Sequence, residues 1–443
     1  MFVRQNDAST ITSDEFLGLA GRLATELASS GSHCINLCED RLNFSLGFCA
    51  GLIANTPNLL PGNRLPKTIS RLIQDYSNCI VLAEEELSGE LALELALLGT
   101  PSINIERLLK RESEAGSSNA PLAEMLTAAI VFTSGSTGEP TSITKRWHTL
   151  CGTTDLLQRR FLTPHQLTSI VATVPPQHMY GLEMSVMMPL RGNCCVHTGR
   201  PFYPADIVNA LSSMPEPRLL VTTPVHMKAL VLSGIPLPDM YGAVSATAPL
   251  DPDLAAAAEQ AWNCPVHEIY GCSEGGSLAS RSTVNDENWT LLDCISLNKH
   301  SGQFIVSAPH LVDAVVLQDE LEIISQSQFR FLGRGGDMLN IGGKRASLIH
   351  LNRELLTIDG VDDGVFFTRS RPGGEERLAA LVVTKLTTGE VSRKLAKVID
   401  PVFLPRPLKK VTSIPRNSLG KSTFSMLQSA LSDTRMDTNN DDY

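Results

Sequence analysis

Hydroxyl residues and glycines gather in one short stretch, directly after a strand-like run from Ala129 to Thr133. This stretch reads Thr133-Ser134-Gly135-Ser136-Thr137-Gly138. Glycines let the backbone fold closely around a ligand, and exposed amides and hydroxyls then point at an anion. The composition therefore predicts a loop that binds polyphosphate, although a flexible Ser/Gly linker has the same composition.

A second group of polar residues ends another strand-like run, which begins at Val266. Tyr270 could stack on a base, Gly271 follows it, and the hydroxyl of Ser273 could hydrogen-bond a phosphate. The carboxylate of Glu274 could hold Mg²⁺, a hard cation that prefers carboxylate and phosphate oxygen. The alternative is an ordinary turn at the end of a strand.

The same turn also fits the nucleophile elbow of serine hydrolases, because Gly271-Cys272-Ser273-Glu274-Gly275 matches G-x-S-x-G. That motif requires a helix directly after Ser273, and the glycine pair Gly275-Gly276 is a poor helix start. Several residues could complete the triad: Asp313 or Asp319, with His310 or His350. The glycine pair disfavours a serine hydrolase, but the available triad residues keep it as an alternative hypothesis.

Two further signals lie nearer the C-terminus. Asp319 precedes Arg334 by fifteen residues, and a carboxylate on a strand end can bond both hydroxyls of a ribose while the arginine reaches sugar or phosphate. Lys421 follows Gly420 in a locally basic region, so it could be delivered to a phosphate. The alternatives are a hairpin edge for the first pair and a solvated basic face for the second. A P-loop is excluded because Pro415 stands where GxxxxGK needs glycine.

Composition narrows the class of protein. The chain has 443 residues, enough for two or three domains, with 42% hydrophobic and 19% charged residues. A net charge of −10 argues against a general nucleic-acid binder, which would be basic. No apolar run is long enough to span a membrane. The close cysteine sets, Cys34/Cys38 and Cys194-Cys195, lack zinc spacing and are interpreted as reduced core residues of a cytoplasmic protein.

The hydrophobic pattern predicts an α/β fold. Thr12 to Glu15 form a capping box that opens a helix. From there helices and strands alternate to Tyr270, which favours mostly parallel sheets covered by helices. Predicted helices after the Ser/Gly loop span 147–161, 181–190, 204–213, 224–233 and 251–262. Predicted strands span 167–174, 194–198, 218–223, 242–246 and 266–270.

The pattern changes after Tyr270. Short alternating runs predict a β-rich end between 277 and 332, and a smaller α+β piece follows. Paired glycines tolerate large backbone changes, so the domain boundary is placed at Gly335-Gly336. We therefore expect an N-terminal domain at 1–334, a mobile C-terminal domain at 335–431, and a disordered acidic tail at 432–443.

The four signals, in this order, resemble the adenylate-forming superfamily of acyl-CoA synthetases, aryl-acid ligases and adenylation domains. Thr133 to Pro140 resembles the phosphate loop of that family, and Tyr270 to Glu274 resembles its Tyr-Gly-x-Thr-Glu motif with serine for threonine. Asp319 and Arg334 have the spacing of its ribose-binding aspartate and following arginine, and Lys421 falls on its catalytic lysine. The chain is shorter than most members of the superfamily, and in this it resembles the ligases of aryl-polyene pigment pathways.

The resemblance implies that ATP and Mg²⁺ activate a carboxylic acid as an acyl-adenylate with release of pyrophosphate. It implies a metal role for Glu274 and a bridging role for Lys421 between carboxylate and α-phosphate. The acyl group would then pass to the thiol of CoA or of phosphopantetheine on an acyl carrier protein. Further residues take roles only through the resemblance: Thr247 and Ala248 beside adenine, His178, Tyr180 and Gly181 at the acyl pocket, Gly336 at the hinge, and Arg345 beside the nucleotide.

Some positions depart from the family pattern. Thr141 stands where the loop usually has lysine, with Lys145 a possible substitute, and Gly336 replaces the usual hinge Asp or Lys. These departures leave a non-catalytic nucleotide-binding relative as another alternative, and they bear on the thiol-transfer step. The acid itself is not identified by the sequence.

Overall fold

The computed structural model describes residues 2–3, 9–110, 121–134, 140–334, 338–341, 344–369, 377–417, 420 and 422–433. The chain forms two compact units. The first comprises Met1–Ser296 and Val306–Val315, and the second comprises Leu297–Ile305 and Val316–Tyr443. The expected domain boundary at Gly335-Gly336 lies outside the described residues and stays a prediction.

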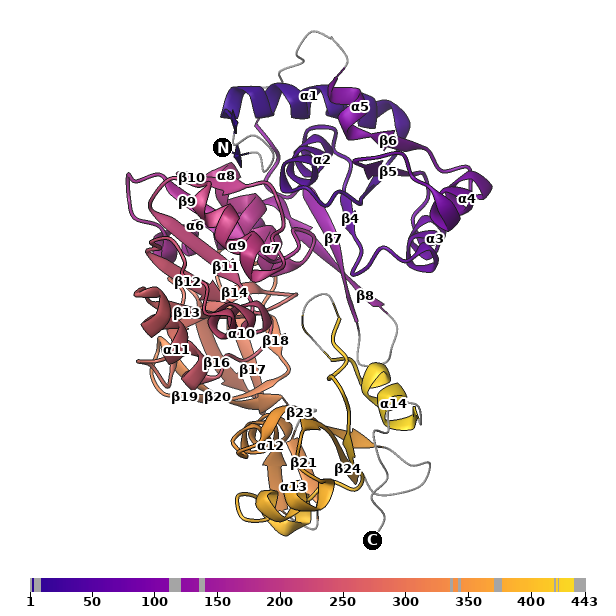
Figure 1. The fold of residues 1–443 in the computed structure, drawn as a ribbon. Helices are drawn as coiled ribbons and strands as arrows, with labels where there is room; N and C mark the ends of the chain where they lie inside the picture. Colours follow the sequence, from indigo (N-terminus) through magenta and orange to yellow (C-terminus); the bar gives the residue numbers. More distant parts are fainter. Residues whose placement is uncertain are drawn as a thin grey trace. The chain divides into compact units, whose positions relative to one another are not determined.

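The first unit contains a sheet whose central strands are parallel. Its strands run in the order β15-β14-β13-β12-β11-β9-β10-β1-β2, and β9 to β14 are labelled in Figure 1. Strands β9 to β13 pair in parallel, whereas β14 returns antiparallel to β13. The bounds are β1 (Phe2–Val3), β2 (Thr10–Ile11), β9 (Thr168–Ala172), β10 (Cys194–His197), β11 (Arg218–Thr222), β12 (Gly242–Ser245), β13 (Val266–Cys272), β14 (Gly276–Ser282) and β15 (Trp289–Leu291).

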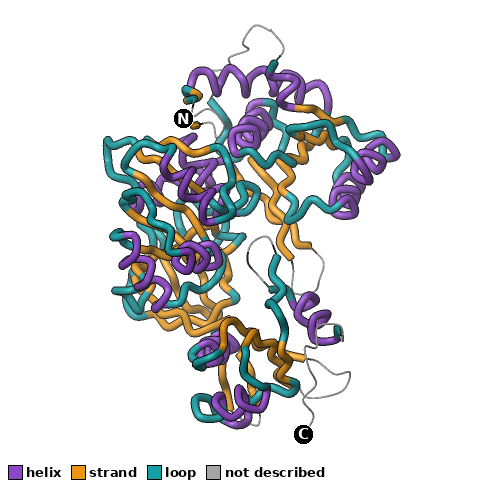
Figure 2. Tube along the Cα trace, viewed as in Figure 1, coloured by secondary structure: helices purple, strands orange, loops and turns teal. Residues whose placement is uncertain are grey.

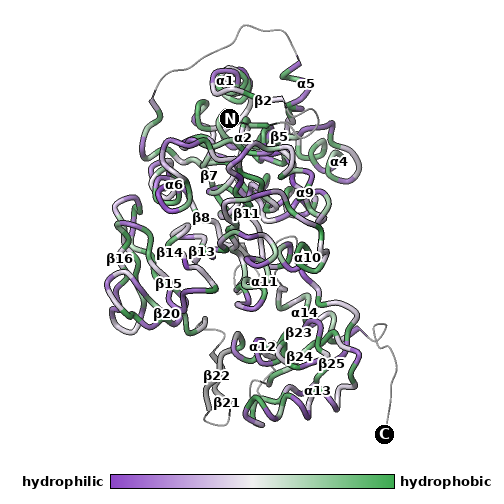
Figure 3. The backbone as a smooth tube through the Cα atoms, turned by 60° about the vertical axis from the view of Figure 1, so that its left-hand side comes forward, coloured by the Kyte–Doolittle hydropathy of each residue, from purple (hydrophilic) through white to green (hydrophobic). Residues whose placement is uncertain are grey.

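Helices α9 (Pro204–Ser212), α10 (Pro224–Ser233) and α11 (Pro252–Trp262) cover one face of this sheet. Their apolar side chains pack with strand residues in a single cluster that includes Leu211, Leu230 and Val266. Parallel strands buried on both faces are rich in apolar residues, as in residues 219–221 of β11, which are buried; Figure 3 colours the backbone around β11 by hydropathy. Helix α6 (Trp147–Phe161) contacts β14 and the segment 183–187.

A second sheet in the same unit has the order β6-β5-β3-β4-β7-β8. All its pairs are parallel except the β7–β8 hairpin. Figure 2 shows strands and helices alternating through this unit. The strands are β3 (His33–Asn36), β4 (Asn58–Leu60), β5 (Cys79–Ala83), β6 (Ser102–Asn104), β7 (Thr127–Ser134) and β8 (Pro140–Arg146); the helices are α1 (Ser13–Ser30), α2 (Arg41–Ile53), α3 (Pro66–Asp75), α4 (Gly89–Leu97) and α5 (Ile105–Leu109).

The second unit includes several separate β elements, among them the paired strands β21 and β22. Strands β19 (Asp319–Ile323) and β20 (Gln328–Arg334) form a hairpin, and β23-β24-β25 form a small sheet. One face of that sheet packs on α12 and α13, and the other on α14. The bounds are β21 (Met338–Ile341), β22 (Lys344–Ser347), β23 (Val361–Arg369), β24 (Arg377–Thr384), β25 (Leu408–Lys410), α12 (Leu348–Leu356), α13 (Thr388–Leu395) and α14 (Phe424–Ser432). Short strands β16 (Ser296–His300), β17 (Gln303–Ser307) and β18 (Val315–Leu317) lie where the chain passes between the units.

The α/β architecture confirms the fold predicted from the hydrophobic pattern. The capping box at Thr12 opens α1, and its side chain accepts the amide hydrogen of Glu15. Helix α6 has the predicted bounds. The helix predicted at 181–190 is instead interrupted: α7 (Met179–Leu182) leads into a π-helical turn, Glu183–Met187, and then α8 (Met188–Arg191). Such turns are frequent at functional sites.

All ten cysteines lie in the described part of the chain, and none forms a disulfide. Cys34, Cys38, Cys194 and Cys195 are buried, which confirms the prediction that these close sets are core residues. Among the helices that the structure describes, none is long and apolar enough to cross a membrane.

Candidate active site

The predicted phosphate loop connects the two strands of the β7–β8 hairpin. Thr133 pairs with Thr141 and Ser134 with Pro140, so the loop leaves and returns at adjacent points. Residues Gly135 to Glu139 lie outside the described residues, as do the side chains of Thr133 and Ser134. Their contacts with phosphate stay a prediction. Thr141 is exposed at the second strand's start.

The Tyr270–Glu274 motif ends β13 and turns tightly into β14. Cys272 pairs with Gly276, so Ser273, Glu274 and Gly275 form a three-residue hairpin loop. Gly276 has φ +74°, the left-handed conformation that such loops need. A Cβ on Gly271 would lie 2.3 Å from the Gly276 carbonyl oxygen, so glycine is needed there for the strands to approach. The hairpin leaves Glu274 exposed at its tip.

This hairpin contradicts the serine hydrolase hypothesis. A nucleophile elbow requires a helix directly after the serine, but Ser273 is followed by strand β14. The candidate histidines also have other settings. The ring of His310 packs against α6 at Gly152, and His350 lies 3.7 Å from Glu354 within α12.

The parallel strands gather several predicted residues at one edge of the sheet. The carboxyl end of β9 leads to the segment with His178, that of β12 to Thr247, and that of β13 to Tyr270. Strand order places β9, β11, β12 and β13 side by side. Ligands of open α/β sheets bind at the carboxyl ends of the strands, so this edge is the candidate active site.

Thr247 has φ +79°, which is unfavourable for a β-branched residue. Backbone strain of this kind clusters at ligand sites and persists where surrounding structure maintains it. The preceding Ala246 is buried, and Ala248 is half-buried. The strain supports the proposed role of Thr247 and Ala248 beside the nucleotide base.

The segment predicted to line the acyl pocket is rigidly placed. The Tyr180 hydroxyl donates to the Val244 carbonyl of β12 at 2.7 Å, and its ring is buried. A Cβ on Gly181 would lie 1.9 Å from the Pro175 carbonyl oxygen. His178 caps α7 by position. Tyr180 therefore joins this segment to the strand that leads to Thr247.

Tyr270 is also packed. Its ring lies 5.6 Å from that of Trp289, and the Arg281 guanidinium covers Trp289 at 4.6 Å. Only 9% of Tyr270 is exposed, so at most an edge of its ring faces solvent. Stacking on a base stays a prediction.

Two ionisable side chains are buried beneath the turn; the sequence reasoning missed Glu183 and considered Lys145 only as a substitute for the cation absent at Thr141. Lys145, on β8, donates from Nζ to the Glu274 carbonyl at 2.7 Å. Glu183, in the π-helical turn, accepts from the Ser277 hydroxyl at 2.5 Å. Burial lowers the pKa of Lys145 and raises the pKa of Glu183 to about 7. A signal existed for Glu183, because it is the only Asp, Glu, Lys or Arg between Pro175 and Leu190.

Asp319 and Arg334 are brought together by the β19–β20 hairpin. Fifteen residues apart in sequence, they are direct partners across the two strands. Asp319 is buried. The side chains of Arg334 and of Arg345, on β22, lie outside the described residues, so their roles toward the ribose and phosphates stay predictions.

Lys421 and Gly336 lie outside the described residues, but the flanks of the lysine turn are visible. Arg416 forms two hydrogen bonds of 2.8 Å with the carboxylate of Asp363 on β23. The Ser422 hydroxyl donates to the Pro415 carbonyl at 2.8 Å, and Gly420 has φ +74°. The described residues on either side of Lys421 are therefore held by hydrogen bonds.

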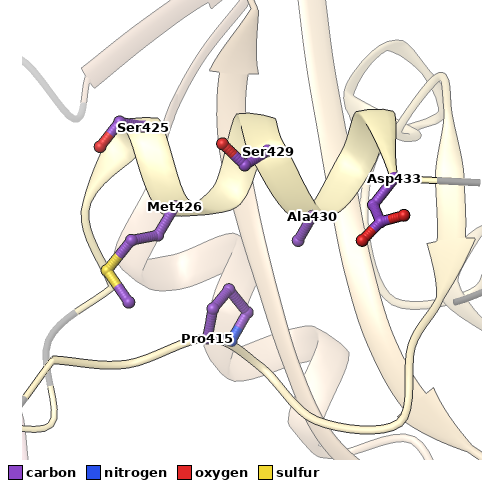
Figure 4. A pocket seen from close by; sticks show the side chains of 6 residues that line it. All are labelled: Pro415, Ser425, Met426, Ser429, Ala430 and Asp433. Atoms are coloured by element: carbon purple, nitrogen blue, oxygen red, sulfur yellow. The ribbon is translucent and has the colours of Figure 1, made fainter. Parts of the chain in front are cut away.

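Other cations of the basic region serve the fold. Lys409 donates to the carbonyls of Leu431 and Asp433 at the end of α14, where a cation is favoured by the helix dipole. An open cavity of about 380 Å³ lies between this helix and Pro415, and Figure 4 shows Pro415 under the helix between Met426 and Ala430. Its lining contains no cation, so it does not suit a phosphate.

The donor set at the first unit's site fits Mg²⁺ bound together with a nucleotide. No group of three or more His, Cys, Asp or Glu that could hold a metal occurs among the described residues. Mg²⁺ is characteristically held by one or two carboxylates plus substrate phosphates. An exposed Glu274 on a fixed turn matches that pattern.

Comparison with known proteins agrees with this architecture. A family model described as AMP-binding enzyme matches residues 64–336, more than half of the chain. A 4-coumarate–CoA ligase of Halorhodospira halophila is 26% identical over 310 residues, covering 68% of this chain and 76% of the relative. A 3,4-dihydroxybenzoate–[aryl-carrier protein] ligase of Bacillus anthracis is 22% identical over 310 residues, covering 67% and 72%.

Solved structures share the fold at low identity. The ATP-bound MatB of Rhodopseudomonas palustris has a TM-score of 0.83 at 19% identity, covering 98% of this chain and 95% of that chain. The o-succinylbenzoate CoA synthetase of Bacillus subtilis, in complex with its acyl-adenylate, has a TM-score of 0.83 at 16% identity, with the same coverage. Together with the family match, the fold and the strand-end site show that this chain belongs to the AMP-binding enzyme family of adenylate-forming ligases.

Proposed function

We propose that the chain activates a carboxylic acid with ATP and passes the acyl group to a thiol. One observation carries the proposal within the first unit. The Lys145–Glu274 hydrogen bond joins the hairpin that carries the predicted phosphate loop to the hairpin that carries the predicted metal ligand. Lys145 and Glu274, 129 residues apart, thus bring the two hairpins into contact, which supports a shared site for a metal-bound triphosphate.

In the first step a carboxylate oxygen of the acid attacks the α-phosphorus of ATP. The bond from that phosphorus to the β-phosphate oxygen breaks, and pyrophosphate leaves. The loop from Ser134 to Gly138 would hold the departing phosphates, with Ser273 as a further donor. Glu274 would hold Mg²⁺, which would neutralise part of the phosphate charge. Positioning and charge neutralisation provide most of the rate in such reactions, and Lys421 would stabilise the charge that builds between carboxylate and phosphate.

In the second step a thiol attacks the acyl carbon and AMP leaves. The acceptor is CoA or the phosphopantetheine of a carrier protein. The named relatives support either, since one is a CoA ligase and the other an aryl-carrier protein ligase. We propose that the substrate is an aromatic or other conjugated acid. We also propose that the protein is cytoplasmic. The unpaired state of all ten cysteines supports that location.

The test is carboxylate-dependent exchange of labelled pyrophosphate into ATP, across a panel of aromatic and aliphatic acids. We expect exchange with a subset of acids, lost in Lys421→Ala and in Glu274→Ala. Trapping with CoA and with a holo-carrier protein then identifies the acceptor.

Ser273→Ala provides a matched control for the hydrolase alternative. It should weaken exchange only partly, and ester hydrolysis without ATP should be absent in the wild type. ATP binding with no exchange for any acid would refute the ligase proposal and favour a non-catalytic nucleotide-binding protein.

A further inference from the structure

Two oppositely charged side chains are buried beneath the Glu274 hairpin. Lys145 is 2% exposed and Glu183 is 1% exposed. Burying a charge is costly unless hydrogen bonds and opposite charge compensate it. Neither residue has a part in the proposed chemistry, and both act on the same short hairpin. We therefore expect both residues to act on the structure of that hairpin.

Lys145 holds the backbone of the candidate metal ligand. It lies on β8, opposite Ala129 on β7, and its Nζ donates to the carbonyl of Glu274 at 2.7 Å. That carbonyl belongs to the middle residue of a three-residue loop, which has no ladder partner of its own. The hydrogen bond from Lys145 therefore fixes the Glu274 carbonyl, which no hydrogen bond between the two strands holds.

Glu183 holds the other end of the same turn. Its carboxylate accepts the Ser277 hydroxyl at 2.5 Å and the Ser277 amide at 3.4 Å. A Cβ on Gly276 would lie 2.4 Å from Oε1 of Glu183, so the carboxylate packs directly on the backbone where β14 begins. The π-helical turn directs this side chain at the hairpin from below.

We propose that Lys145 and Glu183 are positioning residues that hold the Cys272–Ser277 hairpin so that Glu274 presents its carboxylate to the metal of a bound metal–ATP complex. This inference rests on the proposed function. A side chain on a pre-ordered backbone loses less conformational freedom when it binds, and partners beyond the ligand itself often set metal affinity. Loss of either residue should reduce the gain in ATP affinity that Mg²⁺ gives, and should leave the affinity for the acid nearly unchanged.

The variants separate these effects. Lys145→Met keeps the length of the side chain without the donor, Lys145→Arg keeps a cationic donor, and Glu183→Gln keeps an acceptor for Ser277. The matched control is Arg146→Met, because Arg146 is the next residue of β8 and donates to Met125 and Thr127 instead.

The first measurement needs no turnover: ATP affinity by calorimetry with and without Mg²⁺. The wild type should bind ATP more tightly with Mg²⁺. We expect Lys145→Met to reduce that gain about tenfold, the low end of what loss of a partner that orients a metal ligand costs. Glu183→Gln, which keeps an acceptor for Ser277, should reduce the gain by a smaller factor. Lys145→Arg should recover most of the gain, and Arg146→Met should retain it.

The second measurement is the Mg²⁺ dependence of pyrophosphate exchange. Half-saturating Mg²⁺ should rise about tenfold in Lys145→Met, while KM for the acid stays within about twofold. A variant that merely loses thermal stability, with the Mg²⁺ gain unchanged, overturns the proposal. If Lys145→Met does not fold, an unchanged gain in Glu183→Gln overturns it instead.

The outcome is separable from that of the proposed function. A wild type that binds ATP in a Mg²⁺-dependent way but exchanges no pyrophosphate refutes the ligase, while the calorimetric comparison still decides the positioning role. A wild type whose ATP affinity ignores Mg²⁺ overturns the positioning role itself.

Discussion

The buried carboxyl of Glu183 should make the first unit less stable as pH rises. Burial raises its pKa to about 7 from an ordinary 4.5, and Ser277 and the charge of Lys145 only partly oppose this. Between these pH values the folded protein binds a proton that the unfolded chain has released. The free energy of unfolding therefore falls with increasing pH across this window. A difference of about 2.5 pH units corresponds to about 3 kcal/mol.

The assay compares wild type with Glu183→Gln by urea unfolding at pH 5, 6, 7 and 8. The three tryptophans, Trp147, Trp262 and Trp289, all lie in the first unit, so their fluorescence follows the unit that contains Glu183. Other titrating groups are common to both proteins, so the difference in unfolding free energy isolates this carboxyl. The wild type should lose stability relative to the variant up to pH 7 and change little above it.

Two results would refute the reasoning. A difference that is flat from pH 5 to pH 8 would mean that burial does not shift this pKa. A wild type that gains stability relative to the variant as pH rises would mean that Lys145 keeps the carboxylate ionised. Lys145→Met supplies an internal check, because removing the positive charge should raise the pKa of Glu183 further and move the window to higher pH.

Three further predictions concern the same unit. Thr141→Lys restores a cation at the predicted phosphate loop, and an added contact of about 1 kcal/mol should lower KM for ATP about fivefold; equal changes in KM for ATP and for the acid would contradict this. Gly276→Ala combines a positive φ with a Cβ 2.4 Å from Glu183, so its melting temperature should fall well below that of Gly234→Ala, whose positive φ meets open space; similar losses would show that the contact is harmless. Tyr180→Phe leaves a buried β12 carbonyl without its donor and should cost about 1–2 kcal/mol of unfolding free energy, measured by urea unfolding; no change would mean that the carbonyl finds another partner.

Local chemistry in the sequence was enough to define most elements. The capping box at Thr12 predicted where α1 begins, and the helix predicted at 147–161 has the observed bounds of α6. The rule that strands alternating with helices form parallel sheets predicted the architecture. Where prediction missed, the cause was local geometry that the apolar pattern does not contain, as in the π-helical turn at Glu183–Met187.

The sequence by itself identified which residues could bind a nucleotide, because a hydroxyl- and glycine-rich loop, a carboxylate and a lysine follow one another along the chain in the order typical of the family. It disfavoured an elbow at Ser273, because Gly275-Gly276 is a poor helix start, but it did not exclude one; the pairing of Cys272 with Gly276 showed that the turn is a hairpin. Nor could it show that Lys145 and Glu183 converge on one turn. Such contacts join residues 129 and 94 positions apart, and only the packing of two sheets around α6 and the π-helical turn brings those side chains to the backbone that carries Glu274.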